Sequence, residues 1–264
     1  MKEKKAPNIS PKKQGWRHSF KLFLKLLFLL CGVAAIVLGS QLLVGMLLVL
    51  TLGADKLSRP VGTAIYSALS YVLAMILIIS LPNLLAKRGK LGVKKMSRED
   101  LGLKDLPTWT DLGLAPVGFI VYLILAAGII WIFSLFPWFD AEQAQDVGFS
   151  FLISGFDRVV AFLTLVVIAP IAEEIIFRGW LYAKIKYALL SRLSSKIATA
   201  IAIFLVSVLF GIMHMQWNVG VNVFAMSIVL CLLREITGTT YAGILMHMIK
   251  NGLAFYLLYV VGVG

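Results

Sequence analysis

Residues 159–180 read VVAFLTLVVIAPIAEEIIFRGW, an apolar run that leads directly into two adjacent carboxylates and an arginine. Residues 159–172 carry no charge and predict a membrane helix that continues into Glu173, Glu174 and Arg178. A charged side chain at the centre of a membrane helix costs roughly 2.5 to 3.5 kcal/mol, so such residues have a structural or chemical reason to be there. The stretch therefore indicates a polar site inside a membrane protein.

The rest of the chain has the same apolar character. Of its 264 residues, 60% are hydrophobic and 14% are charged, and the mean hydropathy is +0.91. Soluble domains are about half apolar and a quarter charged, so an ordinary soluble protein is excluded. No segment shows the alternation of barrel strands. The charge-free runs predict an all-α, polytopic membrane protein with about seven transmembrane helices; they are 26–54, 60–86, 112–139, 159–172, 197–233 and 236–249.

The formal net charge of +12 marks one membrane face rather than a nucleic-acid surface. Basic residues cluster in the tail 1–25, in the loop that starts at residue 87, and near the ends of the later apolar runs. By the positive-inside rule these segments are cytoplasmic, so we expect an internal N-terminus and an external Gly264. The first apolar run is too long for a signal-peptide core and predicts a retained helix. The Lys-rich tail with Ile, Asn and Ser suits a bacterial plasma membrane protein.

Three parts follow from this pattern. Residues 1–25 form a basic cytoplasmic tail, residues 26–158 hold three transmembrane helices joined by a basic cytoplasmic loop, and residues 159–264 form a helical core with the polar site. The first three helices have no ionisable residue in their middles, so we expect them to pack and anchor. In the loop, the stretch from Ser97 to Asp100 predicts a cap before a short surface helix.

The adjacent glutamates have different expected roles. Glu174 and Arg178 are four residues apart with the acid first, the favourable order for a helical ion pair, and we expect them to form a structural bridge. Glu173 points about 100° away and has no partner on its own helix. A carboxylate without a neighbouring cation, beside apolar side chains, can serve as a general base.

Two histidines also lie in apolar helices. His214 follows Phe210 at the end of one run, and His247 precedes Asn251 in the last run. A single such histidine is as easily a packing residue, but two of them with an unpaired glutamate favour chemistry. The spacing of four puts His247 and Asn251 on one helix face. Lys250 is near that face, and the sequence leaves open whether it takes part.

Helix geometry predicts that Glu173 and His214 meet. The polar break at 191–195 lies midway between them. In an antiparallel hairpin that turns there, each residue stands about 30 Å from the turn. The alternative is that residues 182–193 lie along the membrane surface. Glu173 and His214 would then no longer lie at the same depth in the membrane.

At these residues the chain resembles a known family. Glu-Glu-x-x-x-Arg at 173–178, Phe-x-x-x-His at 210–214 and His-x-x-x-Asn at 247–251 are similar to the three motifs of the CPBP intramembrane endopeptidases, the family of CAAX prenyl proteases and bacteriocin-processing (Abi) proteins. The resemblance covers residues 159–255 and all three motifs occur in order.

The resemblance implies roles for these residues. The position of Glu173 is read as the catalytic glutamate, which activates water together with His214, while His247 and Asn251 stabilise the oxyanion. Glu174, Arg178 and Phe210 would organise the site. No cofactor is then needed. A zinc alternative with Glu173, His214 and His247 as ligands stays open, because two histidines and one carboxylate are the composition of catalytic zinc sites.

Other functions fit the sequence less well. This sequence lacks the motifs of three other classes of intramembrane protease: the serine class, the H-E-x-x-H zinc class and the aspartyl class. A transporter is disfavoured because the two halves do not mirror each other. A non-catalytic membrane scaffold that regulates a partner protein remains the alternative. We expect a membrane peptide or protein as substrate, the lipid bilayer as surroundings and no nucleic acid. Bacteriocin immunity, pheromone maturation and CAAX-type processing are the roles considered, and the sequence does not choose among them.

Overall fold

The computed structural model describes residues 16–87, 95–104, 106–143, 149 and 154–262, and these residues form helices without strands. Seven helical segments are long and apolar enough to cross a membrane, which confirms the predicted all-α, seven-span architecture; they are His18–Leu52, Pro60–Leu84, Trp109–Phe133, Gly155–Leu190, Ser195–Ile212, Trp217–Thr237 and Tyr241–Val261.

Six elements precede the fourth span, and five of them hold the first three spans. The first span lies in α1, and the short α2 follows it. The second span is a continuous helix with a π-helical segment, η1, and the third is α5. Their bounds are α1 Trp16–Leu52, α2 Ala54–Leu57, α3 Pro60–Met75, η1 Ile76–Ser80, α4 Leu81–Lys87 and α5 Trp109–Phe133.

The remaining spans contain three more π-helical segments. The fourth span is one rod made of α6 Gly155–Phe162, η2 Leu163–Ile168, α7 Ala169–Glu174, η3 Ile175–Tyr182 and α8 Ala183–Leu190. It is followed by α9 Ser195–Ile212, α10 Trp217–Thr237, α11 Tyr241–Tyr256 and η4 Leu257–Val261. Side-chain caps explain where two spans begin, because Thr108 accepts from the backbone N–H of Asp111 before α5 and Ser154 accepts from that of Asp157 before α6.

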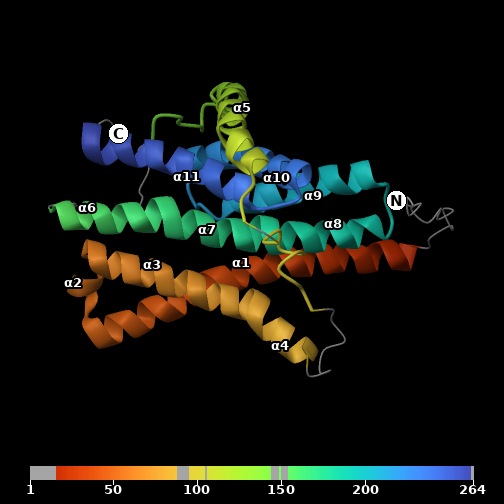
Figure 1. Ribbon diagram of the computed structural model, residues 1–264, viewed down its shortest axis with the longest axis horizontal. Helices are drawn as coiled ribbons and strands as arrows, with labels where there is room; N and C mark the ends of the chain where they lie inside the picture. The colour runs from red at the N-terminus through yellow and green to blue at the C-terminus, as the bar shows by residue number, and fades with distance from the viewer. Residues whose placement is uncertain (1–15, 88–94, 105, 144–148, 150–153, 263–264) are drawn as a thin grey trace.

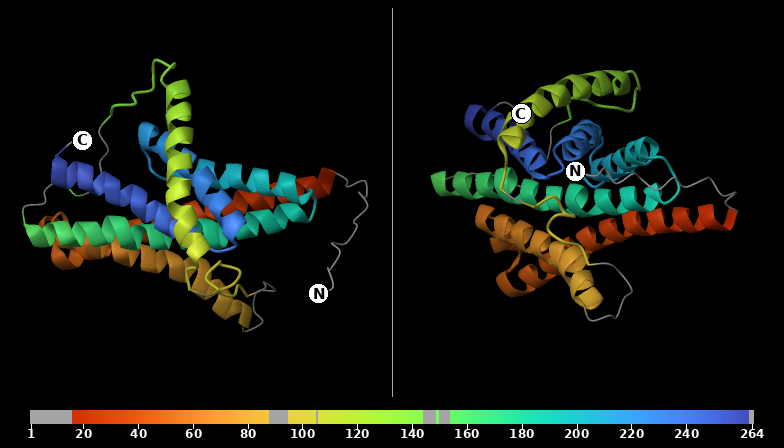
Figure 2. Two further views of the ribbon diagram at one scale, coloured as in Figure 1. Left: turned by 45° about the horizontal axis from the view of Figure 1, so that its top comes forward. Right: turned by 45° about the vertical axis from the view of Figure 1, so that its right-hand side comes forward.

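The rod α6–α8 lies in the middle of the molecule. In Figure 1 the helices α1 and α3 cover one side of it, and α9, α10 and α11 cover the other. Helix α5 crosses the remaining helices steeply (Figure 2) and packs on α10 and α11. The rod that carries the two adjacent glutamates is therefore covered by protein on both sides.

The turn from α9 to α10 depends on two glycines. A Cβ atom on Gly211 would lie 2.7 Å from the carbonyl oxygen of Gly220, and a Cβ on Gly220 would lie 2.9 Å from that of Gly211. Small residues allow membrane helices to approach this closely. The close approach packs the end of α9 against the start of α10, and His214 lies between these two ends in the chain.

The predicted surface helix after Ser97 is wrong. Ser97 and Asp100 do form the expected reciprocal bonds, with the Ser97 N–H donating to Asp100 Oδ2 over 2.8 Å. The chain then makes only a turn that ends at Gly102, where φ is +73°. The carbonyl of Gly102 accepts from the backbone N–H of Thr240 over 3.0 Å, and that of Asp100 accepts from Arg234 over 3.2 Å. The last turn of α10 and the α10–α11 connection thus use carbonyls that a helix would have bonded internally.

Candidate active site

The two glutamates lie halfway along the central rod, at the end of α7 and between the π-helical segments η2 and η3. Single π-helical turns are rare and frequently occur at functional sites. The continuous rod and the antiparallel α9 confirm the predicted hairpin, with its turn at 191–194. The rings of Phe177 and Phe210 are 5.0 Å apart. Phe177 is four residues closer to the turn of the hairpin than Glu173 is, and Phe210 is four residues closer to it than His214 is. This contact agrees with the predicted register, although no hydrogen bond or ion pair joins Glu173 to His214 themselves among the described residues.

Glu174 is the centre of a buried network. Its Oε1 atom accepts from Arg178 Nη1 over 3.0 Å, and both side chains are almost completely buried. The expected ion pair is thus present. The guanidinium also lies over the Phe210 ring, 4.3 Å from its centroid. Glu174 has room because a Cβ atom on Gly243 would stand only 3.1 Å from Glu174 Oε2.

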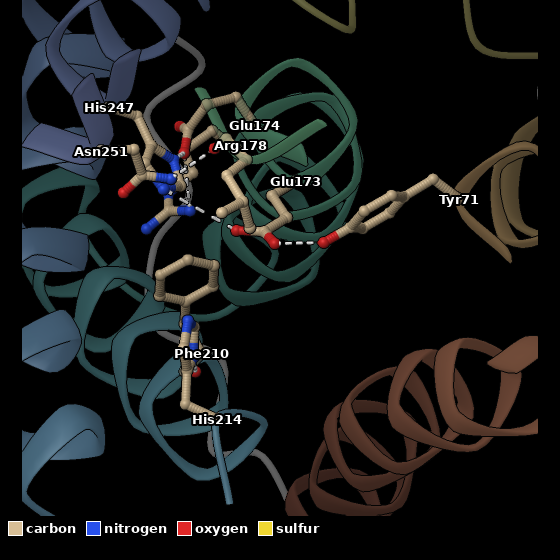
Figure 3. A network of polar contacts seen from close by, with 9 residues as sticks. Tyr71, Glu173, Glu174, Arg178, Phe210, His214, His247 and Asn251 are labelled. Carbon is tan, nitrogen blue, oxygen red and sulfur yellow. Dashed lines mark hydrogen bonds and ion pairs between the residues drawn. The ribbon is translucent and has the colours of Figure 1, made fainter. Parts of the chain in front are cut away.

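His247 connects the two glutamates. Its Nδ1 lies 3.1 Å from Glu174 Oε1, and its Nε2 lies 3.9 Å from Glu173 Oε2. Because a carboxylate oxygen accepts, Nδ1 is the donor of the first contact. The second distance is too long for a direct hydrogen bond. Nε2 and Glu173 Oε2 thus face each other across a short gap (Figure 3).

Sequence reasoning missed Tyr71. Its hydroxyl group donates a hydrogen bond of 2.5 Å to Glu173 Oε1 from α3, on the other side of the rod from His247 (Figure 3). The second span was expected only to pack and anchor, since it lacks an ionisable residue in its middle. A tyrosine in an apolar helix is a weak signal, because its ring alone accounts for its presence there. The partner that Glu173 lacks on its own helix comes from another span.

His214 lies just beyond α9, in the connection to α10. Its Nδ1 is 2.8 Å from the carbonyl oxygen of Phe210, and its ring packs on the Phe210 ring with centroids 4.9 Å apart. A carbonyl only accepts, so Nδ1 carries a proton and Nε2 of the neutral ring is free to accept one. Burial lowers the pKa of His214 below its usual 6.5, although the charge of Glu173 opposes this. No direct hydrogen bond joins His214 to Glu173 among the described residues.

Asn251 is held against the rod one turn beyond His247. Its Nδ2 donates to the carbonyl oxygen of Leu165, in η2, over 2.9 Å. The expected shared face is confirmed, since both His247 and Asn251 contact the rod, at Glu174 and at Leu165. An amide nitrogen has two hydrogens, so Asn251 retains one for another acceptor.

The alternative zinc ligands are not gathered into a site. In the part of the chain that the structure describes, no three His, Cys, Asp or Glu side chains are grouped closely enough to hold a metal ion. Glu173, His214 and His247 therefore do not fit a zinc ion in this arrangement.

The comparison with known proteins covers this same region. Residues 155–253 match the family model of the Rce1-like type II CAAX prenyl endopeptidases. No curated protein and no solved structure matches the chain. The matched segment includes the rod α6–α8 and nearly all of α9–α11, so it holds every candidate site residue except Tyr71, and it confirms the resemblance of the three motifs. Residues 155–253, which are less than half of this integral membrane protein, are thus similar to the Rce1-like type II CAAX prenyl endopeptidases.

Proposed function

We propose that this protein is an intramembrane endopeptidase of CAAX type that hydrolyses peptide bonds of membrane-associated peptides or proteins, with Glu173 as the residue that activates water. One observation carries the proposal. Glu173 has one oxygen held by Tyr71 and the other directed at His247, in the middle of a membrane-spanning rod that is covered by protein on both sides. A carboxylate held in this way is suited to take a proton from water.

The reaction requires a base and an oxyanion site. Glu173 Oε2 takes a proton from a water molecule that Nε2 of His214 helps to orient, and the resulting hydroxide attacks the peptide carbonyl carbon. The free N–H of Asn251 donates to the oxyanion of the tetrahedral intermediate. His247 is held beside this oxyanion site by its Nδ1–H bond to Glu174, with Nε2 on the side of Glu173. Collapse of the intermediate breaks the C–N bond, and the proton passes from Glu173 to the leaving amine.

Glu174, Arg178 and Phe210 hold this arrangement together. Arg178 neutralises Glu174 and rests on Phe210, and Glu174 in turn fixes the His247 ring. Preorganised donors cost no rearrangement when charge develops in the transition state. The three residues thus act through His247 and not on the substrate.

A metal-free reaction is the form that we favour. Its support is the amide of Asn251 beside His247, which suits an oxyanion site, and the absence of a three-residue metal-ligand group among the described side chains. We further propose an internal N-terminus, an external C-terminus and a bacterial plasma membrane, on the basis of the basic clusters and the tail composition. Bacteriocin immunity, pheromone maturation and CAAX-type processing remain the candidate roles.

Cleavage by purified protein tests the proposal. Wild type in nanodiscs is expected to cleave a panel of fluorogenic membrane peptides, and Glu173→Gln and His214→Ala are expected to lose this activity with or without a zinc chelator. Glu235→Gln is the matched control, because Glu235 pairs with Lys186 near the end of α10 and away from the site. Equal cleavage by wild type and both site variants would show a contaminant and favour the scaffold function. Loss on chelation with recovery on added zinc would instead show a metal enzyme.

A further inference from the structure

The side chain of Asp111 is completely buried at the start of α5. One of its oxygens, Oδ2, accepts from the backbone N–H of Thr108 over 2.8 Å and from the Thr108 hydroxyl group over 2.7 Å. The backbone N–H of Asp111 donates back to the Thr108 hydroxyl group over 3.3 Å. These reciprocal bonds cap α5, but they use only one oxygen of the carboxylate.

The other oxygen of Asp111 is bonded to the connection between α10 and α11. Oδ1 accepts from the hydroxyl group of Thr239 over 2.5 Å, and Thr239 lies 128 residues further along the chain. The backbone N–H of Ala242, in the first turn of α11, contributes a further hydrogen bond to the carboxylate. A carboxylate at a helix N-terminus satisfies free N–H groups and complements the helix dipole. Asp111 thus serves the start of α11 as well as the start of α5.

Helix α11 has no side-chain cap from its own N-cap residue. The N-cap residue is Thr240, and its hydroxyl group instead donates to the carbonyl of Gly102 over 3.3 Å. Gly102 lies in a loop, whereas Asp111 lies on a membrane-spanning helix that packs along both α10 and α11. The bond to Asp111 therefore relates the start of α11 directly to the transmembrane bundle.

Helix α11 carries two candidate site residues, His247 and Asn251. His247 follows the first residue of the helix, Tyr241, by six positions, which is about 9 Å along the helix axis. A shift of α11 along this axis would change both the 3.1 Å contact of His247 with Glu174 and the 3.9 Å gap to Glu173. A displacement of about 1 Å can cost a catalytic site on the order of 100-fold in rate. The position of the helix start therefore matters for the site.

We propose that Asp111 is a positioning residue for the candidate active site, which sets the axial position of α11, and hence of His247 and Asn251, through its bond to Thr239. The inference rests on the proposed function and extends its supporting residues to the start of α5, outside the matched segment 155–253. Asp111 acts through α11 and does not contact the substrate. A carboxylate suits this role because both of its oxygens accept.

Two variants that each remove one threonine hydroxyl group from Asp111 test the proposal. Thr239→Val breaks the bond to the α10–α11 connection and leaves the α5 cap intact, whereas Thr108→Val breaks the cap and leaves that bond. For a fluorogenic membrane peptide in nanodiscs, we expect Thr239→Val to lower kcat about tenfold with little change in KM. Thr239→Ser keeps the hydroxyl group and should restore most of kcat. Thr108→Val is the matched control, and it should lower the melting temperature at least as much but keep kcat close to that of wild type.

A spectroscopic signature follows the position of α11 independently of catalysis. The chain has three histidines, so isotope-labelled histidine gives few ring signals in a nuclear magnetic resonance spectrum. The Nδ1–H signal of His247 reports on its bond to Glu174 and is identified by its loss in His247→Gln. We expect this signal to shift in Thr239→Val and to keep its wild-type position in Thr108→Val and Thr239→Ser.

Loss of kcat in both valine variants in proportion to their loss of melting temperature would overturn the proposal, because Asp111 would then support only the fold. So would a wild-type kcat with an unshifted His247 signal in Thr239→Val, or a rise in KM in place of the fall in kcat. A shifted signal in Thr239→Val, when wild type cleaves no peptide, would overturn the proposed function and leave the positioning role. Cleavage by wild type that does not respond to Thr239→Val would overturn the positioning role alone.

Discussion

Tyr71 and Glu173 are joined by a hydrogen bond of 2.5 Å, although they are 102 residues apart and lie in different spans. The bond connects the N-terminal helices, which lie outside the family match, to the candidate catalytic carboxylate inside it. It occupies Oε1 of Glu173 and leaves Oε2 facing His247. The N-terminal helices thus contribute directly to the geometry of the site.

Tyr71→Phe removes this bond and keeps the ring. We expect kcat to fall about tenfold with little change in KM, because the phenol orients the base and does not contact substrate, and a hydrogen bond to a charged group is worth about 1.5 to 3 kcal/mol. Steady-state kinetics on a fluorogenic membrane peptide measures both constants. Tyr66→Phe, on the same helix but against Gly45 of α1, is the matched control. A rise in KM with unchanged kcat would show that Tyr71 binds substrate instead.

The Tyr71–Glu173 hydrogen bond and the Glu174–Arg178 ion pair differ in whether the sequence predicts them. The pair lies within one helix, where a spacing of four is enough to predict contact. The hairpin register of Phe177 and Phe210 also follows from counting residues to a polar break. Such regularities extend along a helix or through one short turn.

Contacts between distant helices are of another kind. Tyr71 meets Glu173 only because α3 packs on the rod, and no local spacing encodes that packing. The steep crossing of α5 over α10 and α11 is likewise set by tertiary packing. The helix predicted after Ser97 does not form for the same reason. The carbonyls of this turn accept hydrogen bonds from Arg234 and Thr240, which lie far along the chain.

Arg178→Met is expected to destabilise the fold strongly. It leaves the completely buried Glu174 carboxylate without its cation, and breaking a buried pair in this way typically costs about 3 to 5 kcal/mol. The double variant Glu174→Gln with Arg178→Met should recover part of the loss, since no uncompensated charge remains. Thermal unfolding in detergent measures both. If the double variant were no more stable than Arg178→Met, the uncompensated carboxylate would not be the cause.

Gly243→Ala tests the space around Glu174. The added Cβ atom would lie 3.1 Å from Glu174 Oε2, so the carboxylate must shift, and its contacts to His247 must shift with it. We expect peptide cleavage to fall severalfold, because small displacements of catalytic groups are costly. Gly128→Ala on α5 is the control, since its Cβ meets nothing within 4 Å, and it should be as active as wild type. Unchanged cleavage by Gly243→Ala would show that Glu174 does not need its present position.

His214 predicts how stability and cleavage depend on pH. Burial lowers its pKa below the usual 6.5, so the unfolded chain binds this proton more readily than the folded protein does. As the pH falls below about 6.5, the fold should therefore lose stability. Cleavage should decline at a lower pH, where Nε2 of the folded protein becomes protonated and can no longer accept a proton. His214→Gln keeps a polar side chain that does not titrate, so its melting temperature should fall less than that of wild type between pH 7 and pH 5. If the melting temperatures of the two proteins changed equally with pH, folding would not lower the pKa of His214.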